Sequence, residues 1–259
     1  MDAPGDDSPE FFNTNWKCIG DKNILARILT EITRVPEHIL KEGLFRNRPY
    51  VAQIVSWASH RWTTRVEDKA YSLMGLLDVN MPMLYGEGKK AFHRLQLEII
   101  RTSHDQSIFA WGRNSHNVRT GSILADDPRF FEDCYDMESL NHDEFLNSLK
   151  KCILQVDLSL IDPDRLGVFP ITNRGIQIWV LLRPYCDSDS VFKAYLPYRN
   201  KFGSLVTINL VLWDSNYYGY SRAFGSSEED SLQFRQVYLK YQAITCNVTF
   251  NEVDHSTMQ

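Results

Sequence analysis

The spacing of apolar residues changes near the middle of this chain, from a helical period to a strand period. Before residue 103, apolar residues recur at every third or fourth position, which is the spacing that buries one face of an α-helix. After residue 150 they recur at every second position, which is typical of half-buried strands. Because helices come first and strands follow, instead of alternating with them, we expect an α+β fold.

Five helices are predicted in the first part of the chain. Ile24, Ile28 and Ile32 lie on one stripe of the first helix, and Leu95 and Ile99 lie on the core face of the last. The predicted helices cover residues 21–34, 36–41, 51–58, 65–77 and 87–102, and a short strand is expected at residues 107–111.

The second part favours several short strands. Alternating runs such as 176–182 and 206–212 are separated by turn signals, for example Asp162-Pro163-Asp164. Seven or eight strands at this spacing favour an antiparallel sandwich or a barrel-like sheet. The expected architecture is an N-terminal helical module followed by an antiparallel β-sandwich-like module.

An acidic stretch separates the two parts. Between residues 122 and 146 there are eight acidic residues and a single base, Arg129. Such a segment is expected to pack poorly, so it is interpreted as a connector. The predicted organisation is therefore a helical module at 1–115, an acidic connector at 116–150 and a β module at 151–252.

Charge and hydropathy limit the possible partners and location. The chain has 28 Lys and Arg residues against 33 Asp and Glu residues, a net charge of −5, which argues against general binding to nucleic acid or to an anionic membrane. No apolar run approaches the length of about 18 residues that a membrane span needs. Because the first seven residues are acidic and lack an apolar stretch, no secretory signal is predicted, and a cytoplasmic protein is expected.

Metal, cofactor and catalytic patterns were not found in the sequence. Its five cysteines and seven histidines are scattered, without the close pairs that begin zinc or redox sites. No glycine-rich nucleotide motif and no nucleophile motif stands out. We therefore predict no structural metal and no cofactor, and we do not expect the chain alone to be an enzyme.

The loop before the last helix is a candidate anion-binding site. Backbone amides at a helix start point outward, and two lysines add positive charge there. Alternatively, the two glycines simply make the turn. Lysines in a first helical turn oppose the helix dipole, so a nearby acid or a ligand should compensate them. The candidate residues are Tyr85, Gly86, Glu87, Gly88, Lys89 and Lys90.

Two further features belong to the helix at 65–77. Thr64 and Glu67 have the spacing of a capping box, in which each side chain accepts a hydrogen bond from the other residue's amide. Gly75 costs a helix about 1 kcal/mol relative to alanine, which suggests a close helix contact. The excess of basic residues between 16 and 103, fourteen against nine acids, is explained by a solvated face or by a surface that meets the acidic connector.

One long segment resembles a known family. The run from Arg61-Trp-Thr-Thr-Arg65 to Ile100, closing with Asp105-Gln-Ser-Ile-Phe-Ala-Trp111, resembles the DUF8212-like region that follows the core of fungal heterokaryon-incompatibility (HET) domain proteins. Residues 3–33 resemble the lead-in to that region. Phe169-Pro-Ile-Thr-Asn-Arg-Gly175 and the strands after it are similar to the β-rich tail of the same proteins.

The resemblance implies a role in non-self recognition. In the family, an amino-terminal domain that resembles the TIR-like signalling fold, for which NAD cleavage has been proposed, triggers programmed cell death on non-self contact. Its Ala-Leu-Ser-Tyr-x-Trp-Gly, Trp-Ile-Asp-x-x-Cys-Ile-Asn-Gln and Trp-Thr-Leu-Gln-Glu motifs are missing here. No catalytic residue is therefore carried over, and a truncated member is expected.

Three hypotheses about function follow. The first is a non-enzymatic regulatory or interaction fragment of a HET-like protein, with a protein partner and possible self-association. The second is the supporting part of a TIR-like NAD-cleaving enzyme whose catalytic half is missing. The third is a β module that binds a small ligand.

Overall fold

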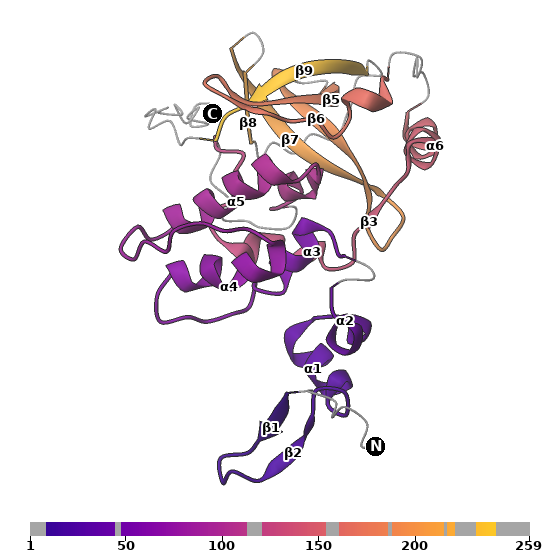
Figure 1. Cartoon of the computed structure of the whole chain (residues 1–259). Coiled ribbons are helices and arrows are strands. Elements are labelled where there is room, and N and C mark those ends of the chain that lie inside the picture. Colours follow the sequence, from indigo (N-terminus) through magenta and orange to yellow (C-terminus); the bar gives the residue numbers. More distant parts are fainter. Residues whose placement is uncertain are drawn as a thin grey trace, which may run out of the picture.

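The structure is a computed structural model. It describes residues 9–44, 48–112, 121–153, 161–185, 188–214, 217–220 and 232–241. Figure 1 shows three parts along one axis: a small N-terminal unit, a layer of helices in the middle and a curved sheet at the far end.

The N-terminal unit is a hairpin followed by two short helices. Strands β1 (Glu10–Phe12) and β2 (Cys18–Asp21) pair antiparallel. The Asp21 carboxylate accepts hydrogen bonds from the amides of Asn23 and Ile24, which turns the chain into α1 (Ala26–Thr33). Helix α2 (Glu37–Glu42) follows and ends at Gly43, where a φ of 79° favours glycine.

The helical layer contains α3 (Val51–Ser56), α4 (Glu67–Leu77) and α5 (Lys90–Thr102). The predicted core face of α5 is buried, including Leu95 and Ile99. The strand predicted at 107–111 is wrong, because residues Gln106–Phe109 form a 3-10 turn, η1. The Asp105 carboxylate accepts a hydrogen bond from the amide of Ser107, and this local bond favours the turn over an extended chain.

The sheet confirms the α+β prediction: apart from the β1–β2 hairpin, which comes first, a helical part is followed by a mainly antiparallel sheet. The strands run in the order β3-β6-β7-β8-β9-β5-β4, and an additional pairing of β6 with β5 closes a ring of β5 to β9. All pairs are antiparallel except β8 with β9. The closed ring makes the sheet barrel-like, which is one of the two expected forms. The strands are β3 (Glu138–Ser139), β4 (Ile171–Thr172), β5 (Gly175–Tyr185), β6 (Ser188–Arg199), β7 (Leu205–Asp214), β8 (Tyr217–Tyr220) and β9 (Gln233–Leu239).

One apolar core joins the helical layer to the sheet. Its buried side chains come from α3, α4 and α5 and from alternate positions of β5, β6 and β7. Phe109 of η1 and Phe169 before β4 meet edge to face, with ring centroids 5.5 Å apart. A second, smaller cluster packs α6 (His142–Cys152) against the other face of the strands, through Phe145 and Leu149.

The acidic stretch packs well, contrary to the expectation of poor packing. Residues 123–125 are buried, and so are Phe131 and Cys134 of the 3-10 helix η2 (Pro128–Cys134). Asn141 and Glu144 form a capping box that starts α6. The prediction considered only the number of acidic residues. The apolar residues between them are buried, and they determine how the segment packs. The module boundaries at residues 115, 150 and 252 stay predictions.

Some expectations lie partly outside the described residues. Cys152, predicted to begin a strand, ends α6 instead, and residues 154–160 of that predicted strand are not described. The strand predicted at 244–250 also lies outside. Within the part of the chain that is described, no helix combines the length and the apolar character needed to cross a membrane.

Candidate functional site

The loop predicted to hold an anion holds the chain's own Glu67. One oxygen of its carboxylate, Oε1, accepts a hydrogen bond from the amide of Gly86 at 2.8 Å and from the amide of Gly88 at 2.9 Å. The Glu67 side chain belongs to the first turn of α4, and the residue is only 7% exposed. The two glycines therefore do cradle a negative charge, and that charge comes from the neighbouring helix.

Backbone hydrogen bonds lower the pKa of the Glu67 carboxyl group. The amide of Gly88 makes the largest contribution, followed by the residue's own amide and that of Gly86, and together they lower the pKa of the Glu67 carboxyl below its usual value. Hydrogen bonds to the charged form of a carboxylate favour that form. Glu67 is therefore held as an anion at neutral pH.

The predicted capping box between Thr64 and Glu67 is wrong. Helix α4 begins at Glu67, its N-cap residue is Val66, and no side chain caps it. The carboxylate of Glu67 accepts hydrogen bonds from the loop amides and from its own amide, and not from the amide of Thr64. The local sequence pattern could not show this competitor, since it lies 19 to 21 residues further along the chain.

The other residues of the predicted loop are also engaged with the protein. Glu87 forms an ion pair with Arg94, with 2.8 Å between Oε1 and the guanidinium Nη1. The guanidinium of Arg65 lies 4.7 Å from the centre of the Tyr85 ring. Lys89 pairs with Asp126 at 3.3 Å. The predicted compensation of the helix-start lysines is confirmed for Lys89, and the partner is an acid.

Basic residues of α4 and α5 meet the acidic stretch. Lys69 lies 2.9 Å from Asp127, and the ring of His93 lies 3.0 Å from Asp126. Partial desolvation raises the pKa of Asp127, but the amide of Arg129 and the ammonium of Lys69 outweigh it, so the pKa is lowered overall. Of the two interpretations of the basic excess, these ion pairs support a surface that meets the acidic segment.

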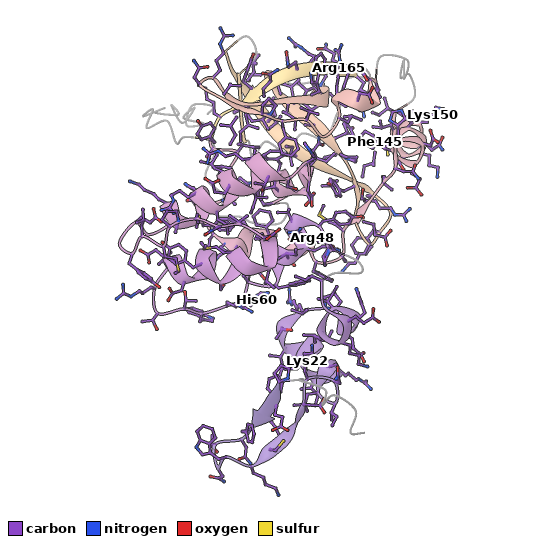
Figure 2. The ribbon with its side chains drawn as sticks, viewed as in Figure 1. Lys22, Arg48, His60, Phe145, Lys150 and Arg165 are labelled. Atoms are coloured by element: carbon purple, nitrogen blue, oxygen red, sulfur yellow. The ribbon has the colours of Figure 1, made fainter. Side chains whose placement is uncertain are left out.

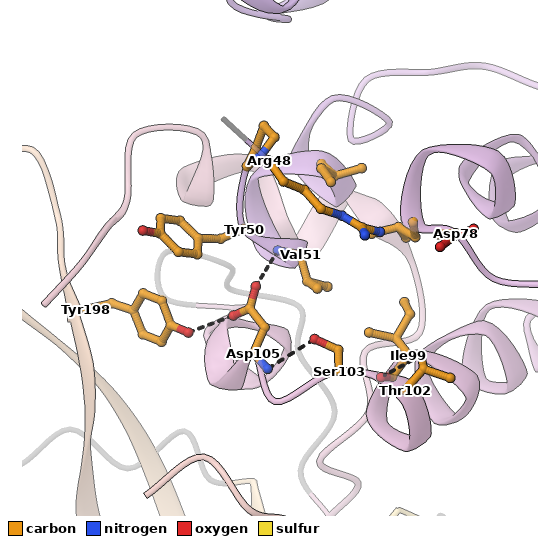
Figure 3. Close-up of a pocket in the computed structure, with 12 residues that line it drawn as sticks. Arg48, Tyr50, Val51, Asp78, Ile99, Thr102, Ser103, Asp105 and Tyr198 are labelled. Carbon is orange, nitrogen blue, oxygen red and sulfur yellow. Dashed lines mark hydrogen bonds between the residues drawn. The ribbon is translucent and has the colours of Figure 1, made fainter. Parts of the chain in front are cut away.

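A polar cavity of about 410 Å³ lies between the helical layer and β6 (Figure 3). Asp105 is at its centre. Its carboxylate accepts hydrogen bonds from the hydroxyl of Tyr198 at 2.6 Å, from the amide of Val51 at 2.7 Å and from the amide of Ser107. One side chain thus links the start of α3, η1 and the sheet.

Tyr198 is held protonated in this cavity. Burial makes the largest contribution, and the negative charge of Asp105 and the hydrogen bond to it add to burial, so the pKa of Tyr198 is raised far above its usual value. The Tyr50 ring meets the Tyr198 ring edge to face at 5.5 Å. Because its oxygens are already engaged, Asp105 positions structure here and is not a free ligand for a guest.

A larger groove, of about 770 Å³, lies between α2 and α4, and residues of the segment that follows α3 also line it. Its walls are mainly apolar, and its lining also includes Lys22, Arg48, Arg61 and Asp78. Arg48 and Asp78 line both cavities, and Figure 3 shows the Arg48 side chain extending toward Asp78. The apolar lining consists of Val35, Ile39, Leu40, Leu44, Trp57, Ala58, Leu73, Leu76 and Gly75.

Sequence reasoning missed both cavities, because their walls come from segments far apart in the chain. Asp105 and Tyr198 are separated by 93 positions. The one signal available in the sequence was Gly75, an unfavourable residue inside a helix. The predicted close helix contact there is wrong, since a Cβ added at Gly75 would meet no heavy atom within 4 Å.

Comparison with known proteins supports the resemblance. The family model for a domain of unknown function, DUF8212, matches residues 90–122. The chain is also 42% identical over 93 residues to vegetative incompatibility protein HET-E-1 of Podospora anserina. The chain is thus similar to a vegetative incompatibility protein over this segment. The aligned part covers 36% of this chain and 7% of HET-E-1, so the chain spans only a small part of that protein's length. No solved structure matches it.

The DUF8212 match covers residues at the centre of the fold. It contains α5, η1 and Asp105. Gln96 of α5 is fully buried, and its amide accepts from the Ala125 N–H and donates to the Ala125 carbonyl. The matched residues therefore make the hydrogen bonds that link the helical layer to the acidic segment and to the sheet.

Proposed function

We propose that this chain is a regulatory or interaction part of a fungal HET-like non-self recognition protein, and that it works by binding another protein and not by catalysis. The single observation that carries the proposal is the 42% identity to HET-E-1 over 93 residues, together with the DUF8212 match. The proposal includes a cytoplasmic location and a part in programmed cell death on non-self contact.

The geometry supports binding over chemistry. At the predicted loop, Glu87 pairs with Arg94 and Lys89 pairs with Asp126, and Asp105 is engaged by three donors. The larger open surface is instead an apolar groove. Apolar clefts with a few polar groups at their edge are typical binding sites.

A pairing experiment tests the role in recognition. The gene that encodes the chain is deleted in its source fungus, and strains are paired with incompatible partners. We expect the death of fused cells to be lost on deletion and restored by the wild-type gene. Restoration should also follow with Lys17→Gln, a change on the exposed hairpin. Cell death that is unchanged by the deletion would contradict the proposal.

A biochemical test addresses the absence of catalysis. The purified chain is incubated with NAD, and release of nicotinamide is followed by chromatography. We expect no release above the rate of a heat-denatured sample. Sustained turnover of NAD would contradict the non-enzymatic part of the proposal and would support the second hypothesis.

A further inference from the structure

We propose that the groove between α2 and α4 binds an amphipathic helix of a protein partner, with the apolar face of that helix against Gly75 and acidic residues beside the groove. The inference deepens the proposed function, because it names the chemistry of the partner and rests on the chain being a binding module. Three observations carry it: the glycine, the unpaired cations and the saturated backbone of the groove walls.

Gly75 is the first observation. Inside a helix, glycine costs about 1 kcal/mol relative to alanine. The chain gains no packing contact in return, because the space above Gly75 is open for at least 4 Å. Gly75 lines the groove and is exposed. A helix without a side chain at this position lets the backbone of a second helix approach closely, so the compensation for the glycine lies outside the described chain.

The cations are the second observation. Lys22, Arg48 and Arg61 all line the groove, and they come from three separate segments. Asp78 is the single acidic residue that lines it. None of the three cations forms an ion pair with a described residue. A partner with several carboxylates would therefore gain from them.

The backbone of the groove walls is the third observation. Two of its walls are the helices α2 and α4, whose amides and carbonyls are largely used within each helix. An extended peptide would find no strand edge there to pair its own backbone groups. A helix brings its backbone already hydrogen-bonded, so it fits an apolar groove at lower cost.

Figure 2 shows how the cations are distributed. Lys22 lies on the N-terminal unit and Arg48 lies where the chain enters the helical layer. The groove therefore spans the junction between these two parts. A helix bound there would contact both of them at once.

The experiment is a selection followed by a titration. The purified chain is used to select from a display library of helical peptides of about four turns. We expect the recovered peptides to carry apolar residues at helical spacing and an excess of Asp and Glu. Labelled recovered peptides are then titrated by fluorescence anisotropy. We expect Gly75→Met, which fills open space, to weaken binding about tenfold or more, since each factor of ten is about 1.4 kcal/mol.

A second variant tests the inference even if Gly75→Met does not fold. Arg48→Gln combined with Arg61→Gln changes two exposed side chains; we expect it to weaken binding and to reduce its dependence on salt, because surface charges are screened over about 8 Å at physiological ionic strength. The control Lys17→Gln should bind like the wild type.

The inference would be overturned if the selection did not enrich acidic peptides, or if binding were insensitive to Gly75→Met. It would also be overturned if oleate, a fatty acid, displaced the peptides, because the groove would then be a lipid site. Sedimentation that shows a dimer closed through this groove would overturn it as well, because the occupant would then be a second copy of the chain. If the groove does not bind the helical peptides but deletion of the gene still abolishes cell death, the proposed function is retained and only the inference about the groove is rejected.

Discussion

Helices α1 and α5 have the same kind of amphipathic sequence and opposite surroundings. On α5, the apolar stripe that includes Leu95 and Ile99 is buried in the core. The matching stripe that begins just before α1 remains exposed: Ile24 is 73% exposed, Ile28 55% and Ile32 74%. A helical period therefore predicts which face of a helix is apolar, but it does not predict what covers that face.

The difference comes from the neighbours of each helix. Helix α5 is enclosed by α4, by residues 123–125 and by Phe131 of η2, whose ring meets that of Phe92 edge to face at 6.3 Å. Helix α1 packs mainly on α2, and Ala26 is its one buried residue. The apolar face of α5 is thus buried in the core, whereas the apolar stripe of the N-terminal unit, residues 9–44, stays exposed.

The largest expected effect on stability is at the buried face of α5. Leu95→Ala should lower the free energy of unfolding by about 2 to 5 kcal/mol, because it leaves a cavity at a fully buried site. Chemical denaturation followed by circular dichroism measures the loss. A loss of less than about 1 kcal/mol would show that α5 is not enclosed as described.

The second-largest loss of stability is expected at the hydrogen bond between Tyr198 and Asp105, which links the sheet to the helical layer. Tyr198→Phe keeps the ring and its contact with Tyr50 but removes the hydroxyl that donates to Asp105. Hydrogen bonds to charged groups contribute about 1.5 to 3 kcal/mol, so a loss of that size is expected in the same denaturation experiment.

The pH dependence of this joint has a definite sign. The pKa of Tyr198 is raised in the folded chain above the usual value of 10.0. Its contribution to stability is therefore fully present below pH 10 and is lost as the pH rises beyond that value. We expect the stability difference between wild type and Tyr198→Phe to shrink above pH 10. A difference that stays constant into strong alkali would contradict this.

A smaller effect of opposite sign is expected in the groove. Gly75→Ala should raise the free energy of unfolding by about 0.5 to 1 kcal/mol, since alanine favours the helix and its Cβ meets open space. The guanidinium midpoint reports the gain. If the variant is less stable, the space above Gly75 is filled within the chain.

The smallest effect is expected on α1. Ile28→Ala should change the free energy of unfolding by no more than about 0.5 kcal/mol, which is usual for exposed positions. Alanine also favours helix, so a small gain would agree with the account. A loss as large as that of Leu95→Ala would show that the stripe on α1 is buried after all.

Much of the fold could be predicted from the sequence. Five helices and the alternating strands at 176–182 and 206–212 were predicted from the period of apolar residues, because one face of each element enters the core. The turn at 106–109 was mistaken for a strand, since a single hydrogen bond from the Ser107 amide to Asp105 decides its form.

The candidate site could be predicted only in part. The sequence offered the amides around Gly86 as one candidate anion site beside a plain turn, and it could not show that Glu67 is close enough to accept their hydrogen bonds. Poor packing of the acidic stretch was predicted from net charge, while its fold depends on buried residues such as Ile123 and on pairing of Asp126 and Asp127 with lysines. The groove depends on long-range packing, which no local pattern encodes.

The most direct test of the account is the pairing experiment with Gly75→Met in place of the wild-type gene. We predict that the variant chain accumulates to the normal level, because methionine favours the helix and meets open space, yet fails to restore cell death in incompatible pairings. Full restoration of cell death by a chain whose groove is filled would contradict the claim that this surface receives the partner.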